Sequence, residues 1–194
     1  MWIKIVIACI PAAVLGLLFD DWMEAHLYNA YVVAATLIIY GVLFIALENS
    51  SITANPSITK VGHVSTKTAL FIGRFQLLSL VPGTSRSGST ILGAMVLGCS
   101  RGVAAEFSFF LGIPVMFGAS FLKLVKCFVQ GNVLTGTQLF YTILGMAIAF
   151  GVSVYSIQFL MGYVRRHDFK FFGYYRIILG VVVLAYFGIT ALAA

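Results

Sequence analysis

Five segments of this sequence are long and apolar enough to cross a lipid bilayer, and they constrain the fold more than any other feature. A spanning helix needs about 20 mostly apolar residues. Charged residues make up only 9% of the chain, against about 25% in a soluble domain, so lipid must contact most of the surface. We predict an all-α polytopic membrane protein with about five transmembrane helices. The predicted helices cover residues 2–19, 30–47, 103–122, 138–161 and 174–193.

A different pattern lies between the second and third of these segments. Residues 68–80 and 87–98 are apolar but only about a dozen residues long, and Pro82 and Gly83 separate them. This pattern predicts a re-entrant helical hairpin over residues 68–98, which enters the membrane and returns to the same side. Irregular backbone at membrane depth must be shielded from lipid, so such a turn favours a ligand site. The alternative is one kinked helix from Thr68 to Gly98.

The distribution of basic residues supports the hairpin. The net charge is +6, but the basic residues are scattered between apolar segments, which indicates membrane topology and not nucleic-acid binding. If the N-terminus is inside, the first connection, with Glu24 and His26, falls outside and has no Lys or Arg. Only Lys123 and Lys126 then lie outside. The inner residues are Lys4, Lys60, Lys67, Arg101, Arg165, Arg166 and Lys170.

One stretch carries most of the polar chemistry. It contains five hydroxyls, two glycines and one arginine within nine residues, Pro82-Gly83-Thr84-Ser85-Arg86-Ser87-Gly88-Ser89-Thr90. Glycines allow close approach of the backbone to a ligand, and amides at a helix start attract anions. A guanidinium matches phosphate oxygens. We interpret this stretch as a cradle for phosphate or diphosphate. The alternative is a helix-capping turn with Arg86 at the membrane interface.

Few other residues suggest chemistry. Glu106 lies early in the third apolar segment and is a candidate to pair with Arg86 or Arg101, because an intramembrane acid is functional by default. Gln76 lies one or two turns before the cradle and is a candidate to face the same cavity. The cysteines Cys9, Cys99 and Cys127 form no close pair, and the histidines His26, His63 and His167 fall in predicted loops. We predict no metal site within this chain.

The cradle and its flanks resemble the undecaprenyl-diphosphate phosphatase, or bacitracin-resistance protein, family. The pattern P-G-x-S-R-S-G-x-T carries the resemblance. It is preceded by Gly73-Arg74-Phe75-Gln76 and followed by Ser100-Arg101-x-x-Ala104-Ala105-Glu106-Phe107-Ser108-Phe109. The resemblance runs through the whole chain, because residues 10–19 are similar to a family segment about a hundred residues from the usual N-terminus.

The resemblance implies catalytic roles for Ser85, Arg86 and Thr90. It implies that Arg86 holds the diphosphate and that Ser85 and Thr90 contact it, with either Ser85 or water as the nucleophile. Substrate-binding residues are then Gly83, Thr84, Ser87, Gly88, Gln76 and Glu106. The implied reaction converts undecaprenyl diphosphate to undecaprenyl phosphate and inorganic phosphate. It recycles the lipid carrier for peptidoglycan synthesis and gives bacitracin resistance.

The family fold implied by the resemblance has two inverted repeats, each a re-entrant hairpin and three spanning helices. Residues 1–47 would end the first repeat, and residues 68–194 would form the second, within one membrane domain. The acidic motif and histidine of the first hairpin have no counterpart here, so the chain resembles the C-terminal two-thirds of a family member. The divalent metal that the family implies, Mg²⁺ or Ca²⁺, would lack its ligands, which leaves the activity of this chain alone open.

A transporter or lipid carrier for an anionic substrate would also use inverted repeats and broken helices. Membrane phosphatases of the acid-phosphatase type need a P-S-G-H motif, which is absent. The expected partners are a polyprenyl diphosphate lipid and the membrane, with no nucleic acid, and a homodimer is left open. The expected location is the bacterial plasma membrane.

Overall fold

The computed structural model describes residues 1–131 and 135–193, and the side chains of all of these except residues 20, 21, 165 and 191–193. Within this part the chain is α-helical and contains no strand, only a single parallel bridge between Ile58 and Cys99. Five helices are long and apolar enough to span a membrane, which confirms the predicted class. They are α1 (Trp2–Leu27), α2 (Ala30–Glu48), α5 (Arg101–Val129), α6 (Gly136–Arg166) and α7 (Lys170–Ala193).

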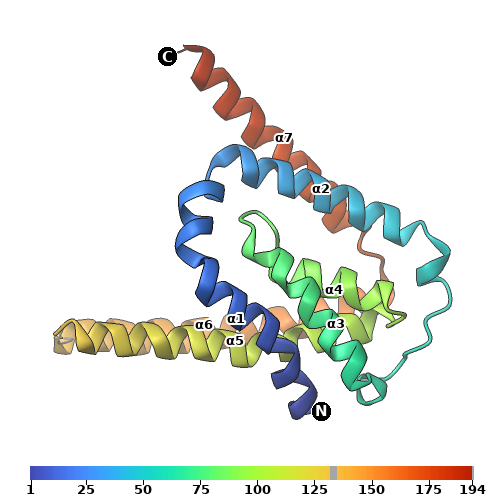
Figure 1. The fold of residues 1–194 in the computed structure, drawn as a ribbon, viewed down its shortest axis with the longest axis horizontal. Helices are drawn as coiled ribbons and strands as arrows, with labels where there is room; N and C mark the ends of the chain where they lie inside the picture. Colours follow the sequence, from blue (N-terminus) through green and yellow to red (C-terminus); the bar gives the residue numbers. More distant parts are fainter. Residues whose placement is uncertain (132–134, 194) are drawn as a thin grey trace.

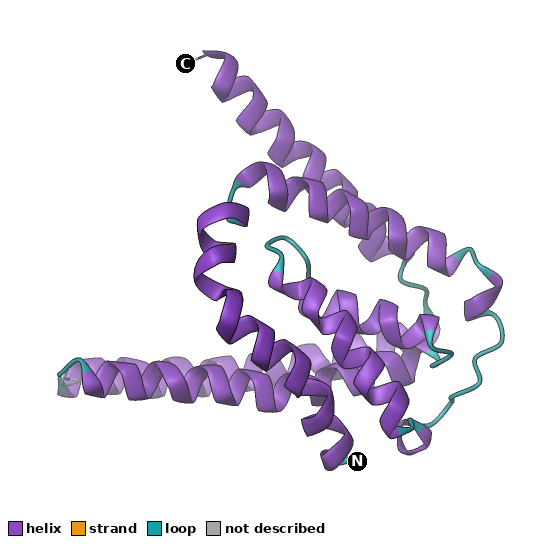
Figure 2. Cartoon of the chain, viewed as in Figure 1, coloured by secondary structure: helices purple, strands orange, loops and turns teal. Residues whose placement is uncertain are grey.

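The predicted hairpin forms, and the alternative of one helix from Thr68 to Gly98 is wrong. Helix α3 (Thr66–Leu77) passes through the short 3-10 turn η3 (Leu78–Leu80) into an irregular segment, and α4 (Arg86–Val96) then runs back along α3. Figure 2 shows this segment as a loop inside the angle between α1 and α2. The hairpin tip is thus shielded by protein, as irregular backbone in a membrane requires.

The hairpin tip is fastened to α2. Thr36 donates its hydroxyl hydrogen to the Pro82 carbonyl oxygen over 2.8 Å. Gly83 adopts φ +84°, which disfavours any other residue. A Cβ at Gly83 would also overlap the Thr36 hydroxyl and the Val33 backbone. This glycine therefore supplies both the turn and the close approach that α2 needs.

The base of the hairpin is closed by the connection between α2 and α3, which contains η1 (Ser51–Thr53) and η2 (Val61–His63). Ile58 donates its amide hydrogen to the Gly98 carbonyl over 2.9 Å and accepts from the Ser100 amide over 2.9 Å. Ser100 then caps α5 by accepting from the Val103 amide. The end of α4 and the start of α5 are thereby held at one end of the fold.

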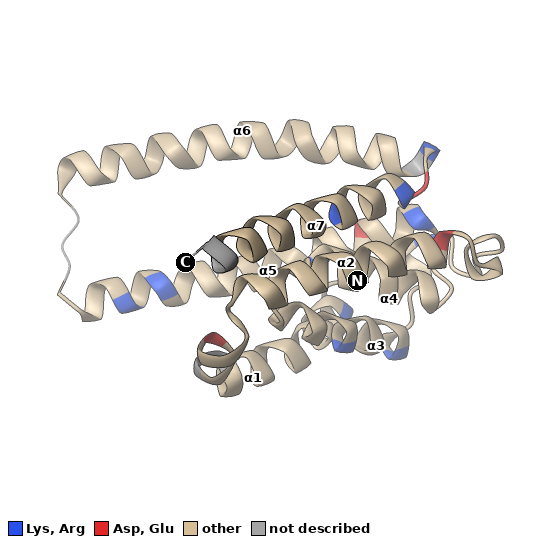
Figure 3. Ribbon diagram, turned by 90° about the horizontal axis from the view of Figure 1, so that it is seen from above, with Lys and Arg blue, Asp and Glu red and all other residues tan. Residues whose placement is uncertain are grey.

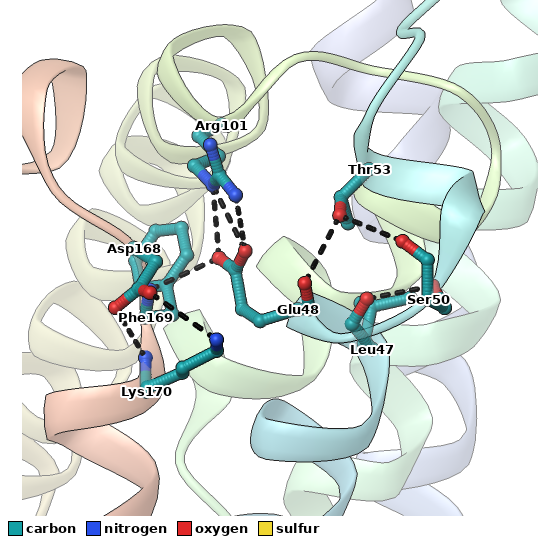
Figure 4. A network of polar contacts seen from close by, with 8 residues as sticks. All are labelled: Leu47, Glu48, Ser50, Thr53, Arg101, Asp168, Phe169 and Lys170. Carbon is teal, nitrogen blue, oxygen red and sulfur yellow. Dashed lines mark hydrogen bonds and ion pairs between the residues drawn. The ribbon is translucent and has the colours of Figure 1, made fainter.

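A buried carboxylate joins three elements at this end (Figure 4). Glu48, at the end of α2, accepts hydrogen bonds from the Arg101 guanidinium with both carboxylate oxygens. It also accepts from the backbone N–H of Phe169, just before α7, over 3.0 Å. The Glu48 side chain is 0% exposed. Glu48 therefore connects α2, α5 and α7 below the hairpin.

Several helix ends differ from the predicted ones. Helix α1 continues to Leu27, so Glu24 and His26 lie on the helix and not in a loop. His26 Nδ1 lies 2.9 Å from the Trp22 carbonyl oxygen and the two rings stack, which stabilises this last turn. Lys123 and Lys126 likewise lie within α5. Hydropathy marks the apolar part of a helix and misses polar turns that extend beyond the bilayer core.

The core lies around the hairpin and not along the long helices. Figure 1 shows α3 and α4 enclosed by α1, α2 and α5, and α2 also packs along α7. Figure 3 shows α6 apart from α1–α4; it packs against α5 and, near its C-terminal end, contacts α7 through Tyr163 and Phe172. Residues 136–159 of α6 are exposed throughout. Because this stretch has no charged residue, lipid would be the natural solvent for its surface.

Candidate phosphate site

The site is built on the first turn of α4. Ser85 is the N-cap, and its hydroxyl oxygen accepts from the Gly88 amide over 3.1 Å. Its hydroxyl also lies 3.2 Å from the Ser87 hydroxyl. The first amides of a helix have no partner within the helix, and together they carry a partial positive charge. The start of α4 therefore presents donors suited to an anion, and the binding of an anion there stays a prediction.

Arg86 supplies a cation beside these amides. Its side chain is half-buried and crosses to α5, where Nη1 lies 3.5 Å from the Gly112 carbonyl oxygen, at the limit of a hydrogen bond. A Cβ on Gly112 would lie 2.7 Å from Arg86 Nη2, so this glycine makes room for the guanidinium. Arg86 lines a partly open cavity between α4, α5 and α6, which favours the cradle over an arginine directed to the interface.

A second guanidinium approaches the same turn from α7. Arg176 Nη2 lies 3.2 Å from the position that a Cβ on Gly88 would take, and its guanidinium stands 5.6 Å from the centre of the Phe44 ring. Its Nη1 atom is buried without a hydrogen-bond partner among the described residues. Arg86 and Arg176 thus each line a cavity that Ser87 also lines. The sequence analysis did not single out Arg176, although an arginine within an apolar helix was the available signal.

Two cavities meet at Ser87. The larger, about 530 Å³, lies between α4, α5 and α6. Its polar lining is Arg86, Ser87, Glu106 and Ser108, and its apolar lining includes Phe110, Ile113, Met116, Ile157 and Met161. The smaller, about 90 Å³, is lined by Ser87, Gly88, Arg176 and surrounding apolar groups. The combination of a cationic head region and an apolar trough fits a lipid that carries an anionic head group.

The hydroxyls of the second turn of α4 face the protein interior. Thr90 is 1% exposed, and its hydroxyl lies 2.6 Å from the Ser108 hydroxyl of α5. It also donates to the Arg86 carbonyl oxygen. Ser89 is fully buried. Thr90 therefore braces α4 against α5, and its predicted contact with substrate stays a prediction.

The remaining predicted site residues differ in whether they line the cavities at Ser87. Glu106 lines the larger cavity, but its predicted ion pair is wrong: Arg101 binds Glu48, and no described cation pairs with Glu106. Gln76 is 2% exposed, and its side-chain oxygen has no hydrogen-bond partner among the described residues. Gly83 and the buried Thr84 form the turn that precedes Ser85. The predicted ion pair of Glu106 is therefore wrong, and the predicted substrate contacts of Gln76, Gly83 and Thr84 stay predictions.

The described residues do not fit a divalent metal. Nowhere in the described ranges do three His, Cys, Asp or Glu side chains come close enough to hold an ion. Glu106 is the sole carboxylate that lines the cavities described above and the polar cavity described below. One carboxylate is fewer than Mg²⁺ or Ca²⁺ sites commonly use when the protein supplies the ligands.

Comparison with known proteins agrees with this geometry. A family model described as "Bacitracin resistance protein BacA" matches residues 1–182. Proteins named undecaprenyl-diphosphatase from Streptococcus thermophilus and Streptococcus mutans are 55% and 54% identical over 186 residues, or 96% of this chain. One from Enterococcus faecalis is 52% identical over 184 residues. The chain spans 65% of the first of these relatives and 66% of the other two.

Proposed function

This chain belongs to the bacitracin resistance protein family, and we propose that it binds and hydrolyses undecaprenyl diphosphate. The observation that carries the proposal is that Arg86 and Arg176 line two adjoining cavities that share Ser87 at the start of α4, the larger of them mainly apolar. The identity of the proposed lipid comes from the relatives, which are named undecaprenyl-diphosphatase. The proposal places the enzyme in the bacterial plasma membrane, where it would recycle the lipid carrier and give bacitracin resistance.

The substrate would lie along the larger cavity. Its diphosphate would bind the first amides of α4 and the two guanidiniums, since forked donors match phosphate oxygens. Its polyprenyl tail would follow the apolar side chains of α5 and α6, including Ile113, Met116 and Ile157. Burial of apolar surface contributes about 25 cal/mol per Å². The tail would therefore provide much of the affinity, and the cradle would provide the specificity for the head group.

The reaction would proceed by attack of water on the terminal phosphorus. The new P–O bond replaces the anhydride P–O bond, undecaprenyl phosphate leaves, and the proton of the water passes to solvent as inorganic phosphate forms. Arg86 and Arg176 would stabilise charge on the phosphoryl oxygens, because phosphoryl transfer depends mainly on positioning and electrostatics. A serine nucleophile needs an adjacent base. Among the described residues the Ser85 hydroxyl has hydrogen-bond contacts with only the Gly88 amide and the Ser87 hydroxyl, which favours water as the nucleophile.

Phosphate release tests this proposal. The purified chain in detergent is incubated with undecaprenyl diphosphate, and inorganic phosphate is measured over time. We expect release by the unchanged chain and by Lys123→Ala, an exposed position on α5 outside the cavities, and loss of release in Arg86→Ala. Lipid that binds and moves across liposomes without phosphate release would indicate a carrier and would contradict hydrolysis.

A further inference from the structure

A third cavity lies on the other side of Glu106 and is mainly polar. Its volume is about 490 Å³, and we call it the vestibule. One wall comes from the connection between α2 and α3, and the other comes from the start of α5. The vestibule is lined by Thr53, Ala54, Thr59, Ser100, Arg101 and Glu106, among others. Thr59 and Ala54 are exposed and lie outside every spanning segment, so the vestibule opens towards an aqueous face.

The vestibule meets the phosphate site at two points. Glu106 lines both the vestibule and the larger cavity that contains Arg86. Val164 of α6 lines both the vestibule and the smaller cavity that contains Arg176. Glu106 and Val164 therefore separate the vestibule from two cavities that Ser87, in the first turn of α4, lines.

The carboxylate of Glu106 needs water to solvate it. Its side chain is half-buried, and it has no hydrogen bond or ion pair with any described residue. A carboxylate at membrane depth without a partner is costly. On the side of the larger cavity its neighbours are mostly apolar, such as Phe109 and Phe110, and the polar ones are Arg86, Ser87 and Ser108. The vestibule, with its hydroxyls and Arg101, is the side from which Glu106 would be hydrated.

We infer that the vestibule is an aqueous portal that delivers water to the phosphate cradle from the face of the α2–α3 connection, with Glu106 at its inner end. This inference deepens the proposed function. The lipid would enter between α5 and α6, whereas the water that hydrolysis consumes would arrive from the opposite side of Glu106. The carboxylate suits this task, because it binds water and disfavours the passage of anions such as the released phosphate.

Sided thiol labelling tests the portal without requiring turnover. Glu106→Cys, Thr59→Cys and Met116→Cys are each made in a chain whose Cys9, Cys99 and Cys127 are replaced by alanine. A membrane-impermeant cationic methanethiosulfonate is applied to sealed vesicles of either orientation. We expect Glu106→Cys and Thr59→Cys to react from the same face. Met116→Cys, in the apolar trough, should react from neither.

A variant that blocks the mouth of the vestibule gives a second test of the portal. Ala54→Trp would fill the mouth of the vestibule and should slow the labelling of Glu106→Cys at least tenfold, whereas Ser51→Trp, an exposed neighbour outside the vestibule lining, should not. Thermal unfolding in detergent verifies that each variant is folded. Labelling of Glu106→Cys only from the other face, or no labelling while Thr59→Cys reacts, would overturn the portal. Neither labelling result depends on phosphate release, so the portal and the proposed hydrolysis can be refuted independently of each other.

Discussion

Glu48 holds Arg101 through both carboxylate oxygens, 53 residues apart in the chain, and accepts the Phe169 amide as a third donor. The pair fixes the start of α5, which carries Glu106 and Ser108 to the phosphate site. A buried carboxylate with three donors leaves little freedom to the elements that supply them. The geometry of the cradle therefore depends on contacts at the base of the hairpin, well away from the proposed substrate.

Loss of Glu48 should destabilise the fold strongly. Removing one partner of a buried ion pair costs about 3–5 kcal/mol, and Glu48→Ala should fall near the lower end because the Arg101 side chain is 37% exposed. The matched control is Asp168→Asn, whose pair with Lys170 is exposed and should contribute about 1 kcal/mol or less. Thermal unfolding in detergent checks both. Equal effects of the two variants would contradict a specific role for Glu48.

A substitution at Gly112 tests the position of the Arg86 guanidinium while the arginine itself stays unchanged. In Gly112→Ala the new Cβ would lie 2.7 Å from Arg86 Nη2. The end of a flexible side chain can move, so we expect near-normal thermal stability but a roughly tenfold or greater loss of phosphate release, or about 1.4 kcal/mol. Gly118→Ala on the same helix meets nothing within 4 Å and should remain active. Full activity of Gly112→Ala would show that phosphate release does not depend on the Arg86 guanidinium lying beside Gly112.

Two substitutions at Ser85 distinguish a role as helix cap from a role as nucleophile. Ser85→Ala removes the cap, which costs about 1 kcal/mol, whereas Ser85→Asn keeps a capping oxygen but has no hydroxyl. If water is the nucleophile, Ser85→Asn should release phosphate faster than Ser85→Ala. A rate assay of the two purified variants decides the matter. Complete inactivity of both, with normal folding and lipid binding, would support the serine as nucleophile.

Cys99 lies outside the spanning helices, and burial raises the pKa of its thiol to about 11 from an ordinary value of 9.0. The native thiol should stay neutral at pH 8, and iodoacetamide should modify it far more slowly than after denaturation. Between pH 9 and 11 the unfolded thiol ionises while the native one does not. The stability that Cys99 contributes should therefore be complete below pH 9 and fall as the pH rises to 11. Equal reaction rates in folded and denatured protein would contradict this burial.

The sequence predicted the membrane class and the hairpin because both follow from local composition. Apolar length marks the five spanning helices, and Pro82 with Gly83 interrupts a run that would otherwise continue. Helix ends were less predictable, since the polar last turn of α1 is stabilised by His26 and Trp22. Contacts between distant segments carry no local signal. Arg176 beside Gly88, and Arg101 on Glu48 and not on Glu106, could be found only from the fold.

In the proposed function, Arg86 and Arg176 together hold a diphosphate at the start of α4. The most direct test is the Kd of the purified chain for undecaprenyl diphosphate, compared with Kd values for Arg86→Ala, Arg176→Ala and the exposed control Lys123→Ala. Each arginine variant should weaken binding at least tenfold, or about 1.4 kcal/mol, and the control should match the unchanged chain. Unchanged affinity in both arginine variants would contradict the account.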